Sequence, residues 1–261
     1  MSWDAKLFNR QLATRRFGRE VRHFEEIDST NSWLAMNHGE FILTGAVAVA
    51  DHQTNGRGRQ ERTWLDVPER SLLCSVLLKF GVATDGLEWL SLLPALALSR
   101  VLQRRVGTTC RVSLKWPNDV QLNDRKVAGI LGQSSVQGAS RIVVLGIGCN
   151  VTLPRAELPE EFRARATSIL DESGAEITRE VLLAELLGEL ELLFDEWCEQ
   201  RFDAIKAAWE QFGPARGTEL SRGEQDNLAV GRYAGLGNRG QLLLADPDGN
   251  IHEVFSGDVF G

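Results

Sequence analysis

The chain has 261 residues, which is enough for one large domain and a smaller one. Hydrophobic residues make up 43% of it and charged residues 25%, as in an ordinary soluble globular protein. The formal net charge of −7 argues against a general nucleic-acid binder, although a local basic patch stays open.

The cysteines, the histidines and the N-terminal segment indicate the cellular compartment in which the protein is expected. The four cysteines are Cys74, Cys110, Cys149 and Cys198, and the four histidines are His23, His38, His52 and His252. The cysteines form no CxxC pair and the histidines lack metal-ligand spacing, so we expect reduced structural thiols and predict no metal-ligating residue. The N-terminus is too charged for a signal peptide, and no apolar run approaches membrane-spanning length. We therefore expect a cytoplasmic protein.

The first part of the chain is predicted to contain both helices and strands. The predicted helices are a short one within residues 1–24, one over 32–38 and one over 87–105, and the predicted strands cover 46–50 and 71–80. The polar run Asp28-Ser29-Thr30-Asn31 offers an N-cap for the second helix. Pro94 is compatible with the third helix if it lies in the first turn or at a kink.

Strand signals dominate both sides of one long helical stretch in the second part of the chain. The predicted strands cover 110–115, 120–123, 126–134 and 141–147, and later the short apolar runs 228–230, 241–245 and 254–255. Asn123-Asp124 marks a tight turn, so antiparallel hairpins are expected. Residues 177–212 are strongly helical, with Thr178 as N-cap and a second helix from residue 202, and Gly213-Pro214 ends this pattern. We predict a domain over 1–213 and a small β domain over 214–261.

The most unusual local feature is the loop over residues 51–62, which contains Gly56-Arg57-Gly58-Arg59. Glycines let a backbone approach a ligand closely, and arginine forks suit phosphate or carboxylate oxygens. The spacing matches neither a Walker loop nor a dinucleotide fingerprint. Taken alone, this segment has two alternative interpretations: a solvated basic loop and a nucleic-acid-binding patch.

A second feature is Lys115-Trp116-Pro117-Asn118-Asp119, which is followed by Lys126-Val-Ala-Gly129. Pro117 is expected to hold Trp116 extended, so that Asn118 and Asp119 project at a strand end. A hairpin of this size returns Lys126 beside them, within reach of one bound ligand. The alternative is a structural turn with a surface Lys–Asp pair of little energetic value.

The third feature is Gly146-Ile147-Gly148-Cys149-Asn150. Two glycines in an apolar strand indicate a bulge or the close approach of a ligand or another backbone. Close packing of a helix on the strand is an equally plausible reason.

Together these segments resemble the biotin–protein ligase family in order and spacing, over about residues 24–261. The matching segments are Ser29-Thr30-Asn31, Gly56–Arg59 with Arg62 and Trp64, Lys115–Asp119, Lys126-Val-Ala-Gly-Ile-Leu131 and Gly146–Asn150, followed by Gly231, Gly240-Gln-Leu-Leu-Leu and Ser256-Gly-Asp-Val259. The resemblance implies an α+β fold: a mixed, mainly antiparallel sheet flanked by helices, as in the class II synthetase-like biotin/lipoate ligase core. It also implies a small C-terminal SH3-like β-barrel, and a catalytic role for residues 1–213.

The resemblance implies an ATP-dependent ligase that forms biotinyl-5′-AMP, with Mg²⁺, and transfers biotin to a lysine of a biotin carboxyl carrier protein. Biotin would be bound by Ser29, Thr30, Asn31, Gln53, Gly56, Arg57, Gly58, Arg59, Trp64, Lys126 and Gly129. ATP would be bound by Arg57, Arg59, Arg62, Lys115, Trp116, Asn118 and Asn150. Lys126, Asp119 and Arg59 would be the catalytic residues.

One departure and two alternatives accompany this interpretation. Gln60-Glu61 stands where relatives often carry Arg-Gly, which leaves the phosphate contacts of the loop open. A lipoate or octanoate ligase or transferase shares the fold, and a nucleic-acid-binding module belongs to another class altogether. The short segment before the ligase-like region predicts no specific DNA binding. The expected partner is the carrier domain of a biotin-dependent carboxylase, with no membrane contact and room for a homodimer.

Overall fold

The computed structural model describes residues 3–60, 62–222, 229–257 and 259–260. Its helices are α1 Ala5–Gln11, α2 Thr30–Asn37, α3 Leu93–Val106, α4 Glu160–Arg163, α5 Ile169–Ser173, α6 Arg179–Cys198 and α7 Phe202–Glu210, with 3-10 turns η1 His38–Glu40, η2 Leu87–Ser91 and η3 Arg155–Glu157. Among these described residues, no helix is both long and apolar enough to cross a lipid bilayer.

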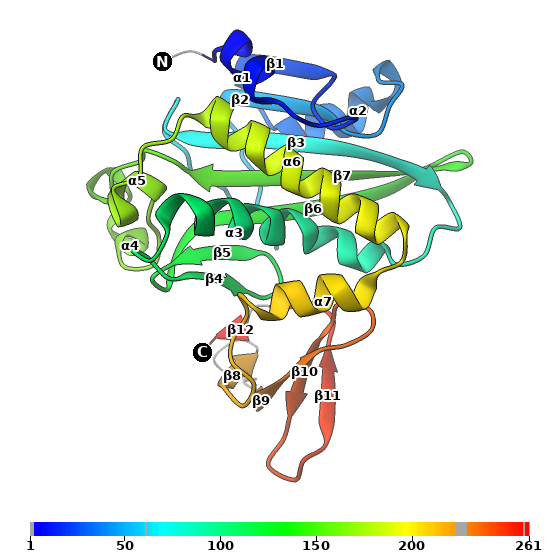
Figure 1. The fold of residues 1–261 in the computed structure, drawn as a ribbon, viewed down its shortest axis with the longest axis vertical. Helices are drawn as coiled ribbons and strands as arrows, with labels where there is room; N and C mark the ends of the chain where they lie inside the picture. The colour runs from blue at the N-terminus through cyan, green and yellow to red at the C-terminus, as the bar shows by residue number, and fades with distance from the viewer. Residues whose placement is uncertain (1–2, 61, 223–228, 258, 261) are drawn as a thin grey trace.

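A seven-stranded sheet forms the larger layer of the molecule (Figure 1). Its strands are β1 Val21–Ile27, β2 Ala46–Gln53, β3 Ser71–Gly81, β4 Val112–Lys115, β5 Asp119–Leu122, β6 Arg125–Gln137 and β7 Ser140–Asn150. Their order is β1-β2-β3-β7-β6-β5-β4, and β1 pairs with β2 in parallel whereas the other pairs are antiparallel. The predicted mixed, mainly antiparallel sheet is therefore confirmed.

Helices cover the two faces of this sheet unequally. Val47 and Val49 of β2 belong to the large core under α3 and α6, whereas Ala46 and Ala48 face the smaller core beside Leu34 of α2. This split follows from the two-residue period of a strand, which sends successive side chains to opposite faces. In Figure 1, α3 and α6 lie side by side across one face.

The last part of the chain forms a second sheet, drawn in orange and red in Figure 1. Its strands are β8 Glu219–Arg222, β9 Ala229–Leu236, β10 Leu242–Ala245, β11 Ile251–Val254 and β12 Val259–Phe260, in the order β11-β10-β9-β8-β12. The small C-terminal β-sheet is thus confirmed. Within the described residues the strands of this sheet pair in an open series from β11 to β12. The predicted closure into an SH3-like barrel is therefore not confirmed.

Several boundaries differ from the sequence-based predictions. β1 and β8 were not predicted, because charged residues interrupt both segments, as Glu25 and Glu26 do in β1. β2 runs on to Gln53, two residues beyond the start expected for the loop. The predicted helix over 87–105 is a 3-10 turn followed by α3, with Pro94 in the first turn. Leu228, in the predicted apolar run 228–230, lies outside the described residues.

A buried carboxylate fastens the N-terminal segment to α6. Glu191, only 5% exposed, accepts backbone N–H bonds from Arg15 at 2.7 Å, Arg16 at 2.6 Å and Phe17 at 3.2 Å. Burial alone would raise the pKa of Glu191, but these three bonds and the nearby Arg16 guanidinium together lower it below its ordinary value. Glu191 thus stabilises the fold in its ionised form.

We expect Glu191→Gln to lower the free energy of unfolding by about 2 kcal/mol at neutral pH, because an amide offers one acceptor oxygen to three donors. Because the folded pKa is lowered, the contribution of Glu191 is complete above the ordinary glutamate pKa and is lost as pH falls through the folded value. Urea unfolding at several pH values measures both effects. Glu199→Gln, at an exposed site 3.6 Å from Arg201, is the control and should change stability by less than about 0.5 kcal/mol. Equal losses in the two variants would contradict this role.

Candidate active site

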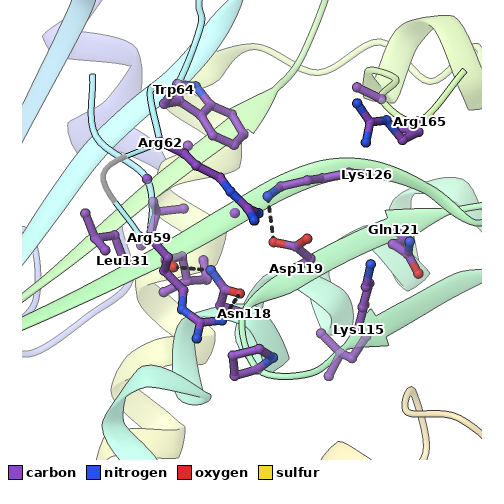
Figure 2. Close-up of a pocket in the computed structure, with 18 of the residues that line it drawn as sticks. Arg59, Arg62, Trp64, Lys115, Asn118, Asp119, Gln121, Lys126, Leu131 and Arg165 are labelled. Atoms are coloured by element: carbon purple, nitrogen blue, oxygen red, sulfur yellow. Dashed lines mark hydrogen bonds and ion pairs between the residues drawn. The ribbon is translucent and has the colours of Figure 1, made fainter. Parts of the chain in front are cut away.

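One large cavity, of about 1150 Å³, opens where the two sheets meet. Its walls come from the N-terminus of α2, the strands β4 to β7, residues 158–166 and the start of the second sheet. A short segment over residues 56–64, named the flap here, adds a further wall. Figure 2 shows labelled side chains of the flap, of β4 to β6 and of residues 158–166 around the same space.

At one end of the cavity, neutral polar side chains form a connected network. The Thr30 backbone N–H donates to Gln53 Oε1 at 2.8 Å, and Thr30 Oγ1 lies 2.7 Å from Ser75 Oγ. Ser75 Oγ donates to Asn31 Oδ1 at 2.5 Å, while Asn31 Nδ2 donates to the Leu131 carbonyl oxygen at 3.2 Å. Thr30 and Asn31 are 3% and 4% exposed. These amide and hydroxyl groups are therefore held in fixed orientations without a charge among them.

Glycines make room for the aromatic and amide side chains at this end. A Cβ on Gly148 would lie 2.5 Å from Trp64 Cε2, and one on Gly129 would lie 3.0 Å from Trp64 Cζ3. On Gly146 it would lie 2.2 Å from Asn31 Oδ1. No larger residue fits at Gly146 or Gly148 unless Asn31 or Trp64 moves, which explains why glycines interrupt this apolar strand.

The flap is a small hairpin closed by its own backbone. Gly58 N–H donates to the Arg62 carbonyl at 2.7 Å, and Trp64 N–H donates to the Gly56 carbonyl at 2.9 Å. Gln60 occupies the left-handed region at φ 54°, as a tight turn requires. Three arginines leave this hairpin, and Arg57, Arg59 and Arg62 all line the cavity.

Arg59 links the flap to two other parts of the molecule. Its Nη1 donates to Asn118 Oδ1 at 3.2 Å, and both terminal nitrogens lie 3.4 Å from the Gly257 carbonyl oxygen. Asn118 in turn donates from Nδ2 to the Ile130 carbonyl at 2.7 Å. The flap, the turn between β4 and β5 and the C-terminal segment are thus joined through one guanidinium. Figure 2 shows Arg59 beside Asn118.

An ion pair lies at the centre of the cavity. Lys126 Nζ is 2.6 Å from Asp119 Oδ1, and it lies 5.6 Å from the Trp64 ring centroid. The β5–β6 hairpin brings the two residues together, with Asn123 and Asp124 in the left-handed region at its turn. The predicted hairpin and the predicted return of Lys126 beside Asp119 are both confirmed.

Most residues predicted for the site do line this cavity. They are Ser29, Thr30, Asn31, Gln53, Arg57, Gly58, Arg59, Arg62, Trp64, Lys115, Trp116, Asn118, Asp119, Lys126, Gly129 and Asn150. Gly56 lies behind them against the Trp64 carbonyl. Two of the lining residues hold neighbouring segments in place: Trp116 Nε1 donates to the Gly240 carbonyl, and Asn150 Nδ2 donates to the Thr167 carbonyl. Glu61 lies outside the described residues.

Other lining residues were not predicted for the site. Phe162 and Arg165 come from an irregular segment without periodicity, and Leu220, Leu242 and Val259 come from the second sheet. The Arg165 carbonyl accepts the Lys126 backbone N–H at 2.8 Å, which places this segment directly against the central lysine. Only tertiary structure brings these residues to the site.

Within the described residues, no group of three or more His, Cys, Asp or Glu side chains could hold a metal ion. The carboxylate of Asp119 faces the cavity, where Lys126 is its partner. A Mg²⁺ ion that arrives with nucleotide phosphates needs only one or two protein carboxylates. The carboxylate of Asp119 is therefore a donor that fits an ion bound to substrate phosphates.

We expect Gly56→Ala to open the flap, because the new Cβ would lie 2.6 Å from the Trp64 carbonyl oxygen. If the opening free energy falls by about 1.4 kcal/mol, trypsin should cleave at Arg57, Arg59 or Arg62 about tenfold faster. Limited proteolysis with mass analysis of the fragments measures the rate. Gly39→Ala, where a Cβ meets nothing within 4 Å, is the matched control. Identical cleavage of the two variants would rule out this function of Gly56.

Comparisons with known proteins agree with this architecture. A family model described as "Biotin/lipoate A/B protein ligase family" matches residues 23–150. The chain is 35% identical over 247 residues to the "Biotin--[acetyl-CoA-carboxylase] ligase" of Mycobacterium tuberculosis, covering 92% of this chain and 88% of that relative. It is 30% identical over 245 residues to the "Bifunctional ligase/repressor BirA" of Escherichia coli, covering 93% of this chain and 74% of that relative.

Among solved structures, the biotin protein ligase from Aquifex aeolicus in complex with biotin and ATP superposes with a TM-score of 0.76. The two chains are 30% identical, and the match covers 92% of this chain and 97% of the other. Similarity in sequence and in fold therefore extends over nearly the whole chain. The protein is a ligase, and it belongs to the biotin–protein ligases of the Biotin/lipoate A/B protein ligase family.

Proposed function

We propose that this protein activates biotin with ATP to form biotinyl-5′-AMP and then transfers the biotinyl group to a lysine of a carrier protein. The observation that carries the proposal is the cavity itself, whose neutral polar end and cationic end meet at Lys126 and Asp119. A substrate with a neutral polar head group and a substrate with anionic phosphates can therefore react at one point. The Aquifex aeolicus relative, a biotin protein ligase in complex with biotin and ATP, supports the same pairing of substrates.

The neutral end suits the head group of biotin. Thr30, Asn31 and Gln53 offer amide and hydroxyl groups, which match an uncharged ureido ring better than charged side chains would. The Trp64 indole, packed on Gly148 and Gly129, offers an apolar surface to the bicyclic body. The remaining members of the proposed biotin set are Ser29, Arg57, Gly58, Arg59, Lys126 and Gly129, which line the cavity, and Gly56, which lies behind the lining.

The cationic end suits ATP. Lys115, Arg59 and Arg62 line this part of the cavity and can neutralise the phosphates, with Asn118 held between Arg59 and the Ile130 carbonyl. Mg²⁺, if it enters with ATP, would find the carboxylate of Asp119 and would supply further positive charge to the phosphates. Arg57, Trp116 and Asn150 complete the proposed ATP set, the last two acting through the structure they hold in place.

In the first step a biotin carboxylate oxygen forms a bond to the α-phosphorus, and the bond from that phosphorus to the β-bridging oxygen breaks to release pyrophosphate. Both reactants are anionic, so the barrier depends on positive charge near the reacting atoms. Lys126 is the cation positioned for this role. It must turn from Asp119 toward the phosphate, a movement for which its 36% exposed side chain has room.

In the second step the carrier lysine nitrogen attacks the carbonyl carbon of the mixed anhydride, and the carbon–oxygen bond to AMP breaks. Asp119, released from Lys126, accepts the proton from that nitrogen, while Lys126 stabilises the oxyanion. AMP is a good leaving group, so no enzyme nucleophile is needed. The flap shields the adenylate from water in the interval.

Further features belong to the same proposal. We propose that residues 1–213 are the catalytic domain and that residues 214–261 form an SH3-like cap, supported by the two separate sheets. The carrier domain of a biotin-dependent carboxylase is the proposed partner, as the name of the Mycobacterium tuberculosis relative suggests. A cytoplasmic location, a lack of specific DNA binding and room for a homodimer remain predictions.

The direct test is incubation of the protein with ATP, Mg²⁺, a biotin carboxyl carrier domain and either biotin or lipoate. The carrier should gain the mass of one biotinyl group, and it should gain none from lipoate. Replacement of the carrier lysine by arginine removes the acceptor and should abolish the gain. A mass gain from lipoate alone would overturn the substrate assignment.

Lys126→Ala should slow biotin-dependent exchange of pyrophosphate into ATP by on the order of 10²–10³, because it removes the central cation from the adenylation step. The assay follows labelled pyrophosphate entering ATP and does not require a carrier. Lys6→Ala, at an exposed position of α1 away from the cavity, is the matched control and should keep the wild-type rate. A wild-type rate in Lys126→Ala would remove Lys126 from the mechanism.

A further inference from the structure

Outside the cavity, one buried carboxylate joins two of the segments that form it. Glu172 of α5, whose side chain is 5% exposed, accepts from Arg125 Nε at 2.8 Å and from Asn123 Nδ2 at 2.8 Å. It also accepts from Thr167 Oγ1 at 3.0 Å. Donor groups of three residues therefore meet at one side chain that does not line the cavity.

The donors flank a short stretch of backbone pairing beside the central lysine. Lys126 N–H donates to the Arg165 carbonyl at 2.8 Å, and Thr167 N–H donates to the Lys126 carbonyl at 2.9 Å. This is a parallel β-bridge between Lys126 and Ala166. Arg125 precedes Lys126 and Thr167 follows Ala166, so the carboxylate of Glu172 holds both strands of the bridge at once.

The segment on the far side of the bridge forms one wall of the cavity. Residues 158–166, named the wall here, contribute Leu158, Phe162, Ala164, Arg165 and Ala166 to the lining. Most of this segment is exposed and only the four-residue helix α4 lies within it, so internal packing does little to hold it. Its position relative to Lys126 depends on the bridge, on Glu172 and on the bond from Asn150 Nδ2 to the Thr167 carbonyl.

The charge on Glu172 strengthens this link. Burial by itself would raise the pKa of Glu172, but hydrogen bonds from Arg125, Asn123 and Thr167 lower it below the ordinary value. The ionised form therefore persists through the neutral range, and its bonds to the donors are charge-assisted.

We propose that Glu172 is a positioning residue for the ligase reaction, which sets the place of the wall against Lys126 and so shapes the nucleotide end of the cavity. The inference rests on the proposed function, because it takes the nucleotide to lie between the wall and Lys126. Glu172 itself touches no substrate. Its loss should weaken the use of ATP while leaving the biotin end, on the far side of Lys126, intact.

The test compares wild-type protein with Glu172→Gln, Thr167→Val and Glu185→Gln. Glu185 accepts two bonds from Arg105 between α6 and α3 and does not line the cavity, so Glu185→Gln is a matched loss of a two-bond ion pair. Thr167→Val removes one bond to Glu172 with little change in shape, which protects the test if Glu172→Gln folds poorly. Amide hydrogen exchange of the wall, residues 158–166, is measured without ligand. KM for ATP and KM for biotin are measured by pyrophosphate exchange.

Glu172→Gln should speed amide exchange in the wall about tenfold and raise KM for ATP about tenfold, as the loss of a charge-assisted hydrogen bond predicts. Thr167→Val should act in the same direction by about threefold, and KM for biotin should change less than about twofold in both variants. Glu185→Gln should match wild type in all three measurements.

The proposal is overturned if Glu172→Gln behaves like Glu185→Gln, or if KM rises equally for ATP and biotin, which would indicate general loosening of the fold. Absence of biotin-dependent exchange in the wild-type protein would instead reject the proposed function. The hydrogen-exchange comparison would still decide whether Glu172 holds the wall, since it requires neither substrate.

Discussion

The ion pair between Lys126 and Asp119 is the point around which the cavity is arranged. At 2.6 Å and partly exposed, it contributes little to the stability of the fold. Its importance is positional, because the β5–β6 hairpin, the flap above it and the wall beside it all meet at this pair. In the proposed mechanism Lys126 and Asp119 stay paired until the substrates bind, so that a cation and a carboxylate are both available beside the reacting atoms.

The parts of the site that the sequence predicts are those within one hairpin or one short motif. Asn118, Asp119 and Lys126 are close in sequence, and a tight turn at Asn123-Asp124 is enough to bring them together. The N-cap at Ser29 is equally local, since its side chain accepts the Ser32 N–H. Most helices and strands could be predicted for the same reason, because their hydrophobic patterns are local. β1 could not be predicted, because charged residues interrupt its hydrophobic pattern.

The rest depends on contacts between distant segments. Arg165 reaches Lys126 across 39 positions of sequence only because β6 and an irregular segment pair for two hydrogen bonds. Gly257 meets Arg59 across the junction of the two sheets. No periodicity in the sequence marks such contacts. Trp116 and Asn150 are a related case: both line the cavity as predicted, yet their polar groups hydrogen-bond to neighbouring segments and hold them in place.

Gly146, against Asn31, and Gly148, against Trp64, limit how the enzyme can be re-engineered for bulkier analogues of the proposed substrate biotin. Neither residue has a side chain to shorten, and a Cβ added at either position would clash with Asn31 or with the indole. Additional volume at that end can come from trimming Trp64 or Leu131, two larger side chains that also line the cavity. A library that keeps both glycines and varies those two positions would therefore search for a wider cavity without disturbing the β-strand.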